Sequence, residues 1–292
     1  MKRAFAGLPI LLIAAAPAQA KLGLEVRSGI SDKGDIYVAK GQSVYLRGTT
    51  SGDTVTVTLR GSNGQSTITP PVERGSFRVA FKARKQGSYL LRASDGSSSS
   101  AVRVNSVLPR AGAGSGGWKV RVLQQGLRRL GFATSTGGRF DGATGRAVNA
   151  FRKTNSMSRT TFASRDVFAK VLRGKGGFEL RHTDKGRYVE FDVSRQVLAL
   201  AQDGKVVNVY QASSGKSSTP TVFGTFRFYR KQPGTNSKGM VHSNYFIRGY
   251  AIHGFKSVPN FPASHGCIRV PIPNSKSVDS QISIGERIYV YR

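Results

Sequence analysis

Short runs of alternating apolar and polar residues fill the first third of the chain. Alternation with a period of two is typical of half-buried β-strands. Turn sequences, among them Asn63-Gly64 and Asp95-Gly96, separate the runs. The predicted strands are residues 24–27, 36–39, 43–47, 54–59, 76–81, 89–92 and 101–104. Residues 21–106 are therefore expected to form an all-β sandwich.

The hydrophobic period becomes helical between residues 118 and 174. Apolar residues three and four apart predict three helices, the first ending at Gly131, the second opening at Thr144 and the third capped by Ser164. Their inward-facing residues are Val120, Leu123, Leu127 and Leu130, then Ala147, Val148 and Phe151, then Val167, Phe168, Val171 and Leu172. The Gly- and Ser-rich run at 111–117 predicts a flexible linker, placed at 107–117, between the sandwich and this helical domain.

Strand patterns return in residues 178–292. The predicted strands are residues 188–193, 197–201, 206–211, 225–229, 245–247, 251–252 and 287–291, with Asp203-Gly204 as a turn. This part is expected to be a mainly β domain. A chain of 292 residues has room for two or three packed cores.

The first 20 residues have the features of a secretory signal peptide. Lys2 and Arg3 precede an apolar run at 8–16, and residues 18–20 form an A-x-A cleavage site. A membrane anchor is the alternative, but the run is too short to cross a bilayer and Pro17 ends it. The protein is therefore expected to be secreted, into the cell wall or a periplasm-like space outside the membrane.

The charge balance is strongly basic. Lys and Arg number 45 against 15 Asp and Glu, a formal net charge of +30. Such an excess favours an anionic partner. Export and the lack of a nucleic-acid-binding motif argue against nucleic acid, which leaves anionic wall polymers, acidic peptides or a lipid surface. Solubility through charge repulsion is the alternative, and the oligomeric state is unknown.

The single cysteine, Cys267, lies in Ser-His-Gly-Cys-Ile-Arg at 264–269, and His253 precedes it by 14 positions. A thiol within reach of an imidazole indicates a nucleophilic cysteine. Residues 204–278 contain ten Lys or Arg and no Asp or Glu, so we expect a positive field that favours the thiolate. An H-E-x-x-H zinc site is excluded, and neither a metal nor a cofactor is predicted.

The group that orients His253 remains open from the residues alone. A backbone carbonyl is expected, with the amides of Asn244 and Asn260 or a distant group as alternatives. His265 is a second possible base, ranked below His253. The other two histidines, His182 and His242, are interpreted as ordinary structural residues.

Residues 252–254, a proline-containing spacer and residues 264–269 resemble the active-site signature of the L,D-transpeptidase catalytic domain of bacterial cell walls. Upstream, residues 214–216, 219–221 and 224–226 resemble the strand and turn motif of that family. The resemblance covers about residues 178–292, and the short spacer resembles that of actinobacterial members. It implies a mainly β sandwich with the thiol at the mouth of a cleft.

The family's chemistry implies a role for each matching residue. Cys267 would attack the carbonyl of the third residue of a tetrapeptide stem, release D-alanine and form a thioester, while His253 moves the proton. The amine of a neighbouring stem would then accept the acyl group. The supporting residues are Gly254, whose carbonyl would orient His253, Gly266, whose N–H would join that of Cys267 in the oxyanion hole, and Ser264 and His265.

Two further residues have alternative interpretations. Arg269 would hold a stem carboxylate or form a structural ion pair. Tyr250 would line the cleft or be a core aromatic residue.

The other two domains also resemble wall-protein modules. Residues 21–106 resemble a bacterial immunoglobulin-like domain, without the paired cysteines and core Trp of antibody domains, and a spacer or adhesion role is expected. Residues 118–174 resemble the small three-helix peptidoglycan-binding domain, with Arg152 where that family usually has Gln. A helical spacer that binds nothing is the alternative.

Three functions are therefore compatible with the sequence. The first is a cross-linking L,D-transpeptidase acting on peptidoglycan stem peptides. The second is an L,D-carboxypeptidase, in which water accepts the acyl group. The third is a wall-binding protein whose catalytic domain is idle.

Overall fold

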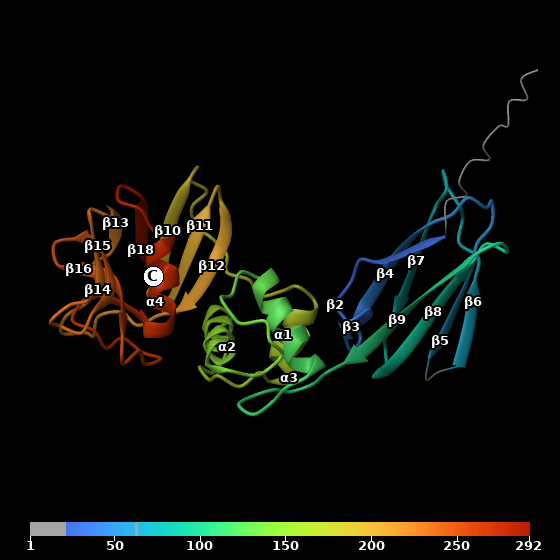
Figure 1. The fold of residues 1–292 in the computed structure, drawn as a ribbon, viewed down its shortest axis with the longest axis horizontal. Coiled ribbons are helices and arrows are strands. Elements are labelled where there is room, and N and C mark those ends of the chain that lie inside the picture. The colour runs from blue at the N-terminus through green and yellow to red at the C-terminus, as the bar shows by residue number, and fades with distance from the viewer. Residues whose placement is uncertain (1–21, 62–63) are drawn as a thin grey trace, which may run out of the picture.

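The structure is a computed structural model that describes residues 22–61 and 64–292. The predicted signal peptide lies outside the described residues. Three units follow one another along the long axis of the molecule, with three helices between two β units (Figure 1). None of the helices in the described ranges combines the length and apolar character that crossing a bilayer requires.

The N-terminal β unit consists of two sheets packed around one core. Its strands are β1 (Gly23–Val26), β2 (Ile30–Asp32), β3 (Asp35–Ala39), β4 (Ser43–Thr49), β5 (Thr56–Gly61), β6 (Gly64–Ile68), β7 (Ser76–Lys82), β8 (Gly87–Ser94) and β9 (Ser99–Val107). The sheets have the orders β1-β4-β7 and β2-β3-β9-β8-β5-β6. Along β4, buried and exposed residues alternate as the sequence pattern predicts.

Each of the seven strands predicted here overlaps an observed strand. The sequence did not predict β2 and β6. β2 has only three residues, and every residue of β6 is exposed, so neither carries an apolar–polar alternation.

The helical unit contains α1 (Trp118–Arg129), α2 (Gly142–Thr154) and α3 (Arg165–Leu172). All residues predicted to face inward are buried except Leu130, which is partly buried. Ser164 caps α3 as predicted, because its Oγ accepts the N–H of Val167 at 3.5 Å. α2 begins before Thr144, since Asp141 is its N-cap and accepts the Thr144 N–H at 2.8 Å.

The segment 111–117, predicted to be flexible, is held by backbone pairing. Ala111 and Ala163 exchange two N–H···O bonds of 3.0 and 2.8 Å, and the Gly117 N–H donates to the Gly138 carbonyl at 3.0 Å. The expected flexibility is therefore wrong. Composition cannot reveal these hydrogen bonds, because the groups that pair with the backbone of this segment come from distant positions in the chain.

The C-terminal β unit also consists of two sheets, and it contains a fourth helix. Its elements are β10 (Arg187–Asp192), β11 (Val197–Gln202), β12 (Lys205–Gln211), β13 (Gly224–Arg227), β14 (Arg230–Thr235), β15 (Val241–Ile247), β16 (Tyr250–Phe255), β17 (Ile268–Pro271), α4 (Ile272–Ser280) and β18 (Arg287–Tyr291). The sheet orders are β12-β11-β10-β18-β13 and β14-β15-β16-β17. Completely buried residues fill the space between them: Phe191, Leu198, Ile252, Ile268 and Ile288.

All seven predicted strands overlap observed ones here too, but β14, β17 and α4 were not predicted. The polar, proline-containing sequence of β14 has no alternating pattern. β17 is short, and α4 follows it with a proline at its second position.

One hydrophobic core extends from the helical unit into both β units. It includes Ile30 and Tyr37 on one side and Val197, Ala199 and Val209 on the other. The ring of Tyr37 stacks on that of Trp118 with centroids 4.7 Å apart. The helices are therefore packed against the C-terminal β unit, which contains the cysteine.

Candidate active site

The parallel strands β16 and β17 place the two candidate catalytic side chains on one face of their sheet. The register pairs Ile252 with Ile268 and His253 with Arg269. Both isoleucines point into the core. Because successive side chains of a strand alternate between faces, His253, Arg269 and Cys267, which immediately precedes Ile268, project from the other face.

Residues 256–267, called the active-site loop below, connect the two strands and end in a tight turn. The Ser264 Oγ donates to the carbonyl of Cys267 at 2.5 Å and accepts the N–H of Gly266 at 3.1 Å. Gly266 has φ +112°, and a Cβ there would lie 1.9 Å from the ring of Tyr250. Only glycine fits this position. Its N–H is already bonded, which contradicts the expectation that it is a free oxyanion-hole donor.

The upstream motif lies against this loop. The carbonyl of Ser214 accepts the N–H groups of Ala263 and Ser264 at 2.8 and 2.9 Å. The Thr221 Oγ1 donates to the carbonyl of Gly266 at 2.8 Å. Two sequence signatures separated by about fifty residues therefore form one hydrogen-bonded unit.

His253 is 3% exposed, and its ring is oriented by the backbone. The Nδ1 atom lies 2.9 Å from the Gly254 carbonyl oxygen. A carbonyl only accepts, so Nδ1 carries the proton and Nε2 keeps a free lone pair. Burial lowers the pKa of His253 to about 4, more strongly than the Gly254 carbonyl raises it. The imidazole is therefore neutral at pH 7.

Cys267 has its thiol in a partly buried position, 3.7 Å from the Gly249 carbonyl, to which it donates. Burial raises the pKa of this thiol, while a hydrogen bond from the Ala251 backbone and the charges of Arg269 and Lys238 lower it by less. The positive field therefore acts in the expected direction, because the charges of Arg269 and Lys238 both lower the pKa, but it does not produce a resting thiolate. Desolvation outweighs the field, and thiol and imidazole are both neutral at pH 7.

Comparison with known proteins adds to this geometry. Residues 186–290 match the family model of the L,D-transpeptidase catalytic domain, YkuD. A solved L,D-transpeptidase structure from Xylanimonas cellulosilytica, its residues 123–326, is 32% identical, with 63% of this chain and 98% of that chain covered and a TM-score of 0.58. The chain belongs to the L,D-transpeptidase family.

Another L,D-transpeptidase structure, from Stackebrandtia nassauensis, has 18% identity, covers 62% of this chain and 95% of that chain, and gives a TM-score of 0.40. A comparison with curated proteins gave no match. The family model and the Xylanimonas cellulosilytica structure identify this protein as an L,D-transpeptidase, and its family acts on peptidoglycan stem peptides. In residues 22–61 and 64–292 no three His, Cys, Asp or Glu side chains gather in a way that could hold a metal ion.

Two candidate substrate residues of this L,D-transpeptidase, Arg269 and Tyr250, lie on β17 and β16. The guanidinium carbon of Arg269 lies 4.1 Å from the centroid of the Phe255 ring, and Nη1 donates to the Ala263 carbonyl at 3.4 Å. Within the described part of the chain no carboxylate forms an ion pair with Arg269, which contradicts the ion-pair interpretation. Tyr250 is partly buried and packs on the core, with its ring against Gly266.

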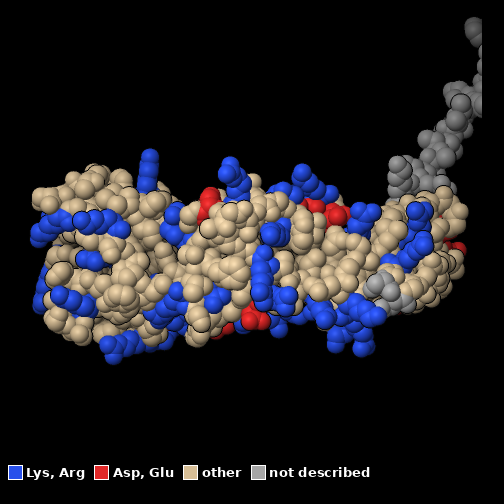
Figure 2. All heavy atoms as spheres, turned by 90° about the horizontal axis from the view of Figure 1, so that it is seen from below, with Lys and Arg blue, Asp and Glu red and all other residues tan. Residues whose placement is uncertain are grey.

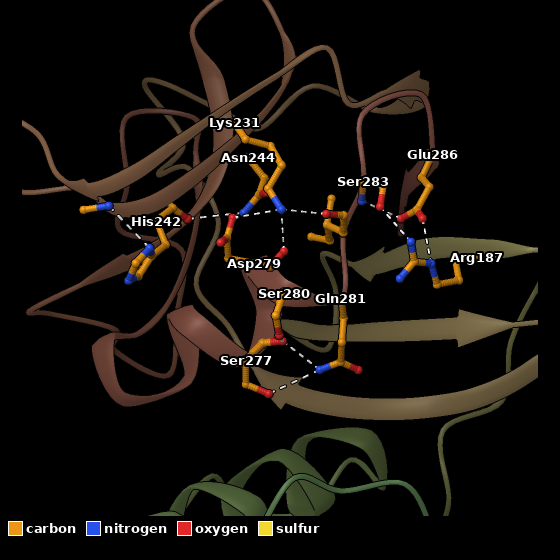
Figure 3. Close-up of polar contacts among 12 residues, drawn as sticks. Arg187, Lys231, His242, Asn244, Ser277, Asp279, Ser280, Gln281, Ser283 and Glu286 are labelled. Atoms are coloured by element: carbon orange, nitrogen blue, oxygen red, sulfur yellow. Dashed lines mark hydrogen bonds and ion pairs between the residues drawn. The ribbon is translucent and has the colours of Figure 1, made fainter.

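The amides considered as partners of His253 point elsewhere. The Asn244 Nδ2 donates to the His242 carbonyl at 3.2 Å, beside Lys231, whose ammonium donates to the Asp279 carbonyl at 2.6 Å (Figure 3). Asn260 faces the helical unit. The orienting group present in the structure is the carbonyl of the adjacent residue, the type of group that was expected.

The other three histidines lie outside the pair. The ring of His182 stacks on Tyr289 with centroids 3.6 Å apart. The Nδ1 of His242 accepts the N–H of Gly234 at 3.4 Å. His265 is exposed in the turn, two positions before Cys267.

Sequence reasoning missed the small hydrophobic cluster that Cys267 of this L,D-transpeptidase packs against. Met240, Tyr245 and Ala251 pack together with Cys267, and the carbonyl of Gly249 accepts its thiol. Every residue has a carbonyl, so no sequence signal distinguishes Gly249. Its role follows from the turn between β15 and β16.

Proposed function

We propose that this L,D-transpeptidase cross-links peptidoglycan stem peptides through a thioester on Cys267, with His253 as the general base. The observation that supports the proposal is the contact between His253 Nδ1 and the Gly254 carbonyl. It leaves Nε2 as the only free ring nitrogen, on the sheet face that the thiol shares. A neutral base next to a neutral thiol is suited to moving a proton during attack.

In the first half-reaction, the Cys267 sulfur attacks the carbonyl carbon of the third residue of a tetrapeptide stem. Its proton passes to His253 Nε2. The peptide C–N bond then breaks, and the proton moves to the amine of the departing D-alanine. General base catalysis of this kind contributes about 10²- to 10⁴-fold to a rate.

In the second half-reaction, an amine from the third residue of a neighbouring stem attacks the thioester. It gives its proton to His253, the C–S bond breaks, and the proton returns to sulfur. We assign the oxyanion contact to the Cys267 N–H, because the Gly266 N–H is bonded to Ser264. One such donor contributes about 2.7 to 4 kcal/mol.

Substrate contacts follow from charge. Arg269 faces the same side of the sheet as the thiol and has no carboxylate partner in the described residues, so it is available for a stem carboxylate. Tyr250 and His265 border the turn that carries Cys267 and complete the proposed cleft.

Lys and Arg side chains spread over the face shown in Figure 2, with few acidic residues, which supports anionic wall polymers as further partners.

The remaining features are assigned by resemblance. We infer secretion from the signal at residues 1–20, peptidoglycan binding by the helical unit and a spacer role for the N-terminal β unit. These three assignments, secretion, peptidoglycan binding and the spacer role, are independent of the chemistry at Cys267.

The test is product analysis with disaccharide tetrapeptides. Dimers lacking one D-alanine support cross-linking, and trimmed tripeptides alone indicate a carboxypeptidase. Cys267→Ala should give neither product while binding to isolated walls is unchanged. The absence of products from the wild type would contradict the proposal and favour a wall-binding protein.

A further inference from the structure

The active-site loop is held from outside its own domain. The Asn149 Nδ2 on α2 donates to the Asn260 Oδ1 at 2.7 Å. The Asn260 Nδ2 donates to the Arg159 carbonyl at 2.8 Å, and the Arg159 guanidinium donates back to the Asn260 carbonyl. One loop residue therefore uses its side-chain amide and its backbone to contact two segments of the helical unit.

These contacts have little help from apolar packing. Phe261, the residue after Asn260, is 62% exposed, and the loop contributes no residue to the hydrophobic cores apart from the contact of Cys267. Asn149 itself is 4% exposed and also donates to the side chain of Gln211. Partly buried hydrogen bonds, whose geometry is directional, thus hold the middle of the loop.

A second contact comes from Lys153, one turn after Asn149 on α2. It is 2% exposed, and its ammonium donates to the carbonyls of Ala212 at 3.0 Å and Gln196 at 3.5 Å. No carboxylate within the described ranges forms an ion pair with it. Burial lowers the pKa of Lys153 to about 7. Burying an amine without an acidic partner costs stability, which an apolar residue would avoid.

The acceptors of Lys153 lead directly to the catalytic turn. Gln196 donates through Nε2 to the Ser214 Oγ at 2.8 Å and accepts the Ser214 N–H at 2.7 Å. The Ser214 carbonyl accepts the N–H of Ser264, whose Oγ donates to the carbonyl of Cys267. A continuous series of hydrogen bonds therefore connects α2 with the residue that carries the thiol.

We propose that Asn149 and Lys153 are positioning residues for the reaction at Cys267. They fix the active-site loop and the segment on which it rests, so that the thiol and the adjacent N–H have the geometry for acylation. The helical unit then supports the geometry of the catalytic domain, and this role is independent of any glycan that the helical unit binds. This inference rests on the proposed function of Cys267.

The test compares two reactions of the same sulfur in the full chain. Acylation by a carbapenem requires the correct loop geometry, whereas alkylation by iodoacetamide at a fixed pH requires only that the sulfur is accessible and can ionise. Intact mass against time gives the maximal acylation rate, the half-saturating carbapenem concentration and the alkylation rate. Asn260→Ala, Asn149→Ala and Lys153→Met are each measured, and the last keeps the length of the side chain while removing its donors.

Each variant should lower the maximal acylation rate about tenfold or more, as expected for a small misplacement of reacting groups. The half-saturating concentration and the alkylation rate should stay within about twofold. The Asn149→Ala/Asn260→Ala double variant should lose less than the product of the two single losses, because both changes break the contact between these two residues.

The matched control is Arg146→Ala. Arg146 lies on the same helix and crosses the same interface, but its Nε donates to the Asn274 Oδ1 of α4 at 2.8 Å and does not reach the loop. The Arg146→Ala variant should be acylated at the wild-type rate. An equal loss in this control, unchanged acylation in the three test variants, or a parallel loss of alkylation would each overturn the inference. A wild type that is not acylated would refute the proposed function itself, and the inference with it.

Discussion

The Nδ1 atom of His253 lies 2.9 Å from the carbonyl oxygen of Gly254, the next residue on β16. A carboxylate in this place would raise the pKa of the imidazole by its charge, but a carbonyl supplies only a dipole. Burial therefore dominates and keeps the ring neutral. The candidate site therefore has a neutral imidazole and a neutral thiol on one face of the sheet, in contrast to a preformed thiolate–imidazolium pair.

The pH dependence of thiol alkylation follows from this arrangement. Because burial raises the pKa of Cys267, its alkylation rate by iodoacetamide should still be rising with pH above 8. Mass spectrometry of the full chain at pH 5 to 10 measures the profile, with free cysteine as the reference. A plateau already reached below pH 7 would reveal a resting thiolate and contradict the neutral pair.

The stability of the fold should decrease in weak acid because of His253. Its pKa is about 4 when folded, against about 6.5 when unfolded, so the unfolded state binds an extra proton between these values. The contribution of His253 is fully present above pH 6.5 and is lost as the pH falls towards 4, by up to about 3 kcal/mol. Denaturant unfolding of wild type and His253→Gln at pH 4.5 and 7.5 measures it. The free energy of unfolding should change less between the two pH values in His253→Gln than in the wild type. The exposed control His265→Gln should show the same change as the wild type.

Gly266→Ala should destabilise the catalytic turn. The methyl group would overlap the Tyr250 ring at a positive φ, so we expect a loss of about 2 kcal/mol or more in the free energy of unfolding, together with loss of acylation. Gly249→Ala is the control, since nothing lies within 4 Å of its Cβ position. Urea unfolding compares the two. Equal stability of both variants would show that the turn can rearrange.

Arg269→Met should weaken substrate binding more than catalysis. The guanidinium lies on the thiol's face of the sheet without a carboxylate partner in the described chain, so its removal should raise KM for a tetrapeptide stem about tenfold, with kcat reduced less. Arg181→Met is matched, because Arg181 stacks on Tyr291 at 4.0 Å in the same way. Steady-state release of D-alanine provides both constants. A fall in kcat with unchanged KM would exclude the binding role.

Local sequence signals predicted much of this protein because they arise from neighbouring residues. The apolar faces of α1 to α3 follow from spacing alone, and each predicted strand of both β units overlaps an observed one. β6, with no buried residue, and the polar β14 exist only because a neighbouring strand supplies hydrogen bonds. A partner strand is not visible in local sequence.

The candidate site divides in the same way. The sequence by itself determined the candidate nucleophile, the candidate imidazole, the glycine of the turn and the family signature, because these are properties of residue type and spacing. The tertiary structure decided that Gly254 orients His253, that the Gly266 N–H is already bonded, and that burial outweighs the positive field at Cys267. It also brought Asn149 to Asn260, 111 positions away. Desolvation and hydrogen-bond partners depend on which distant segments pack together, and that packing exists only in the folded chain.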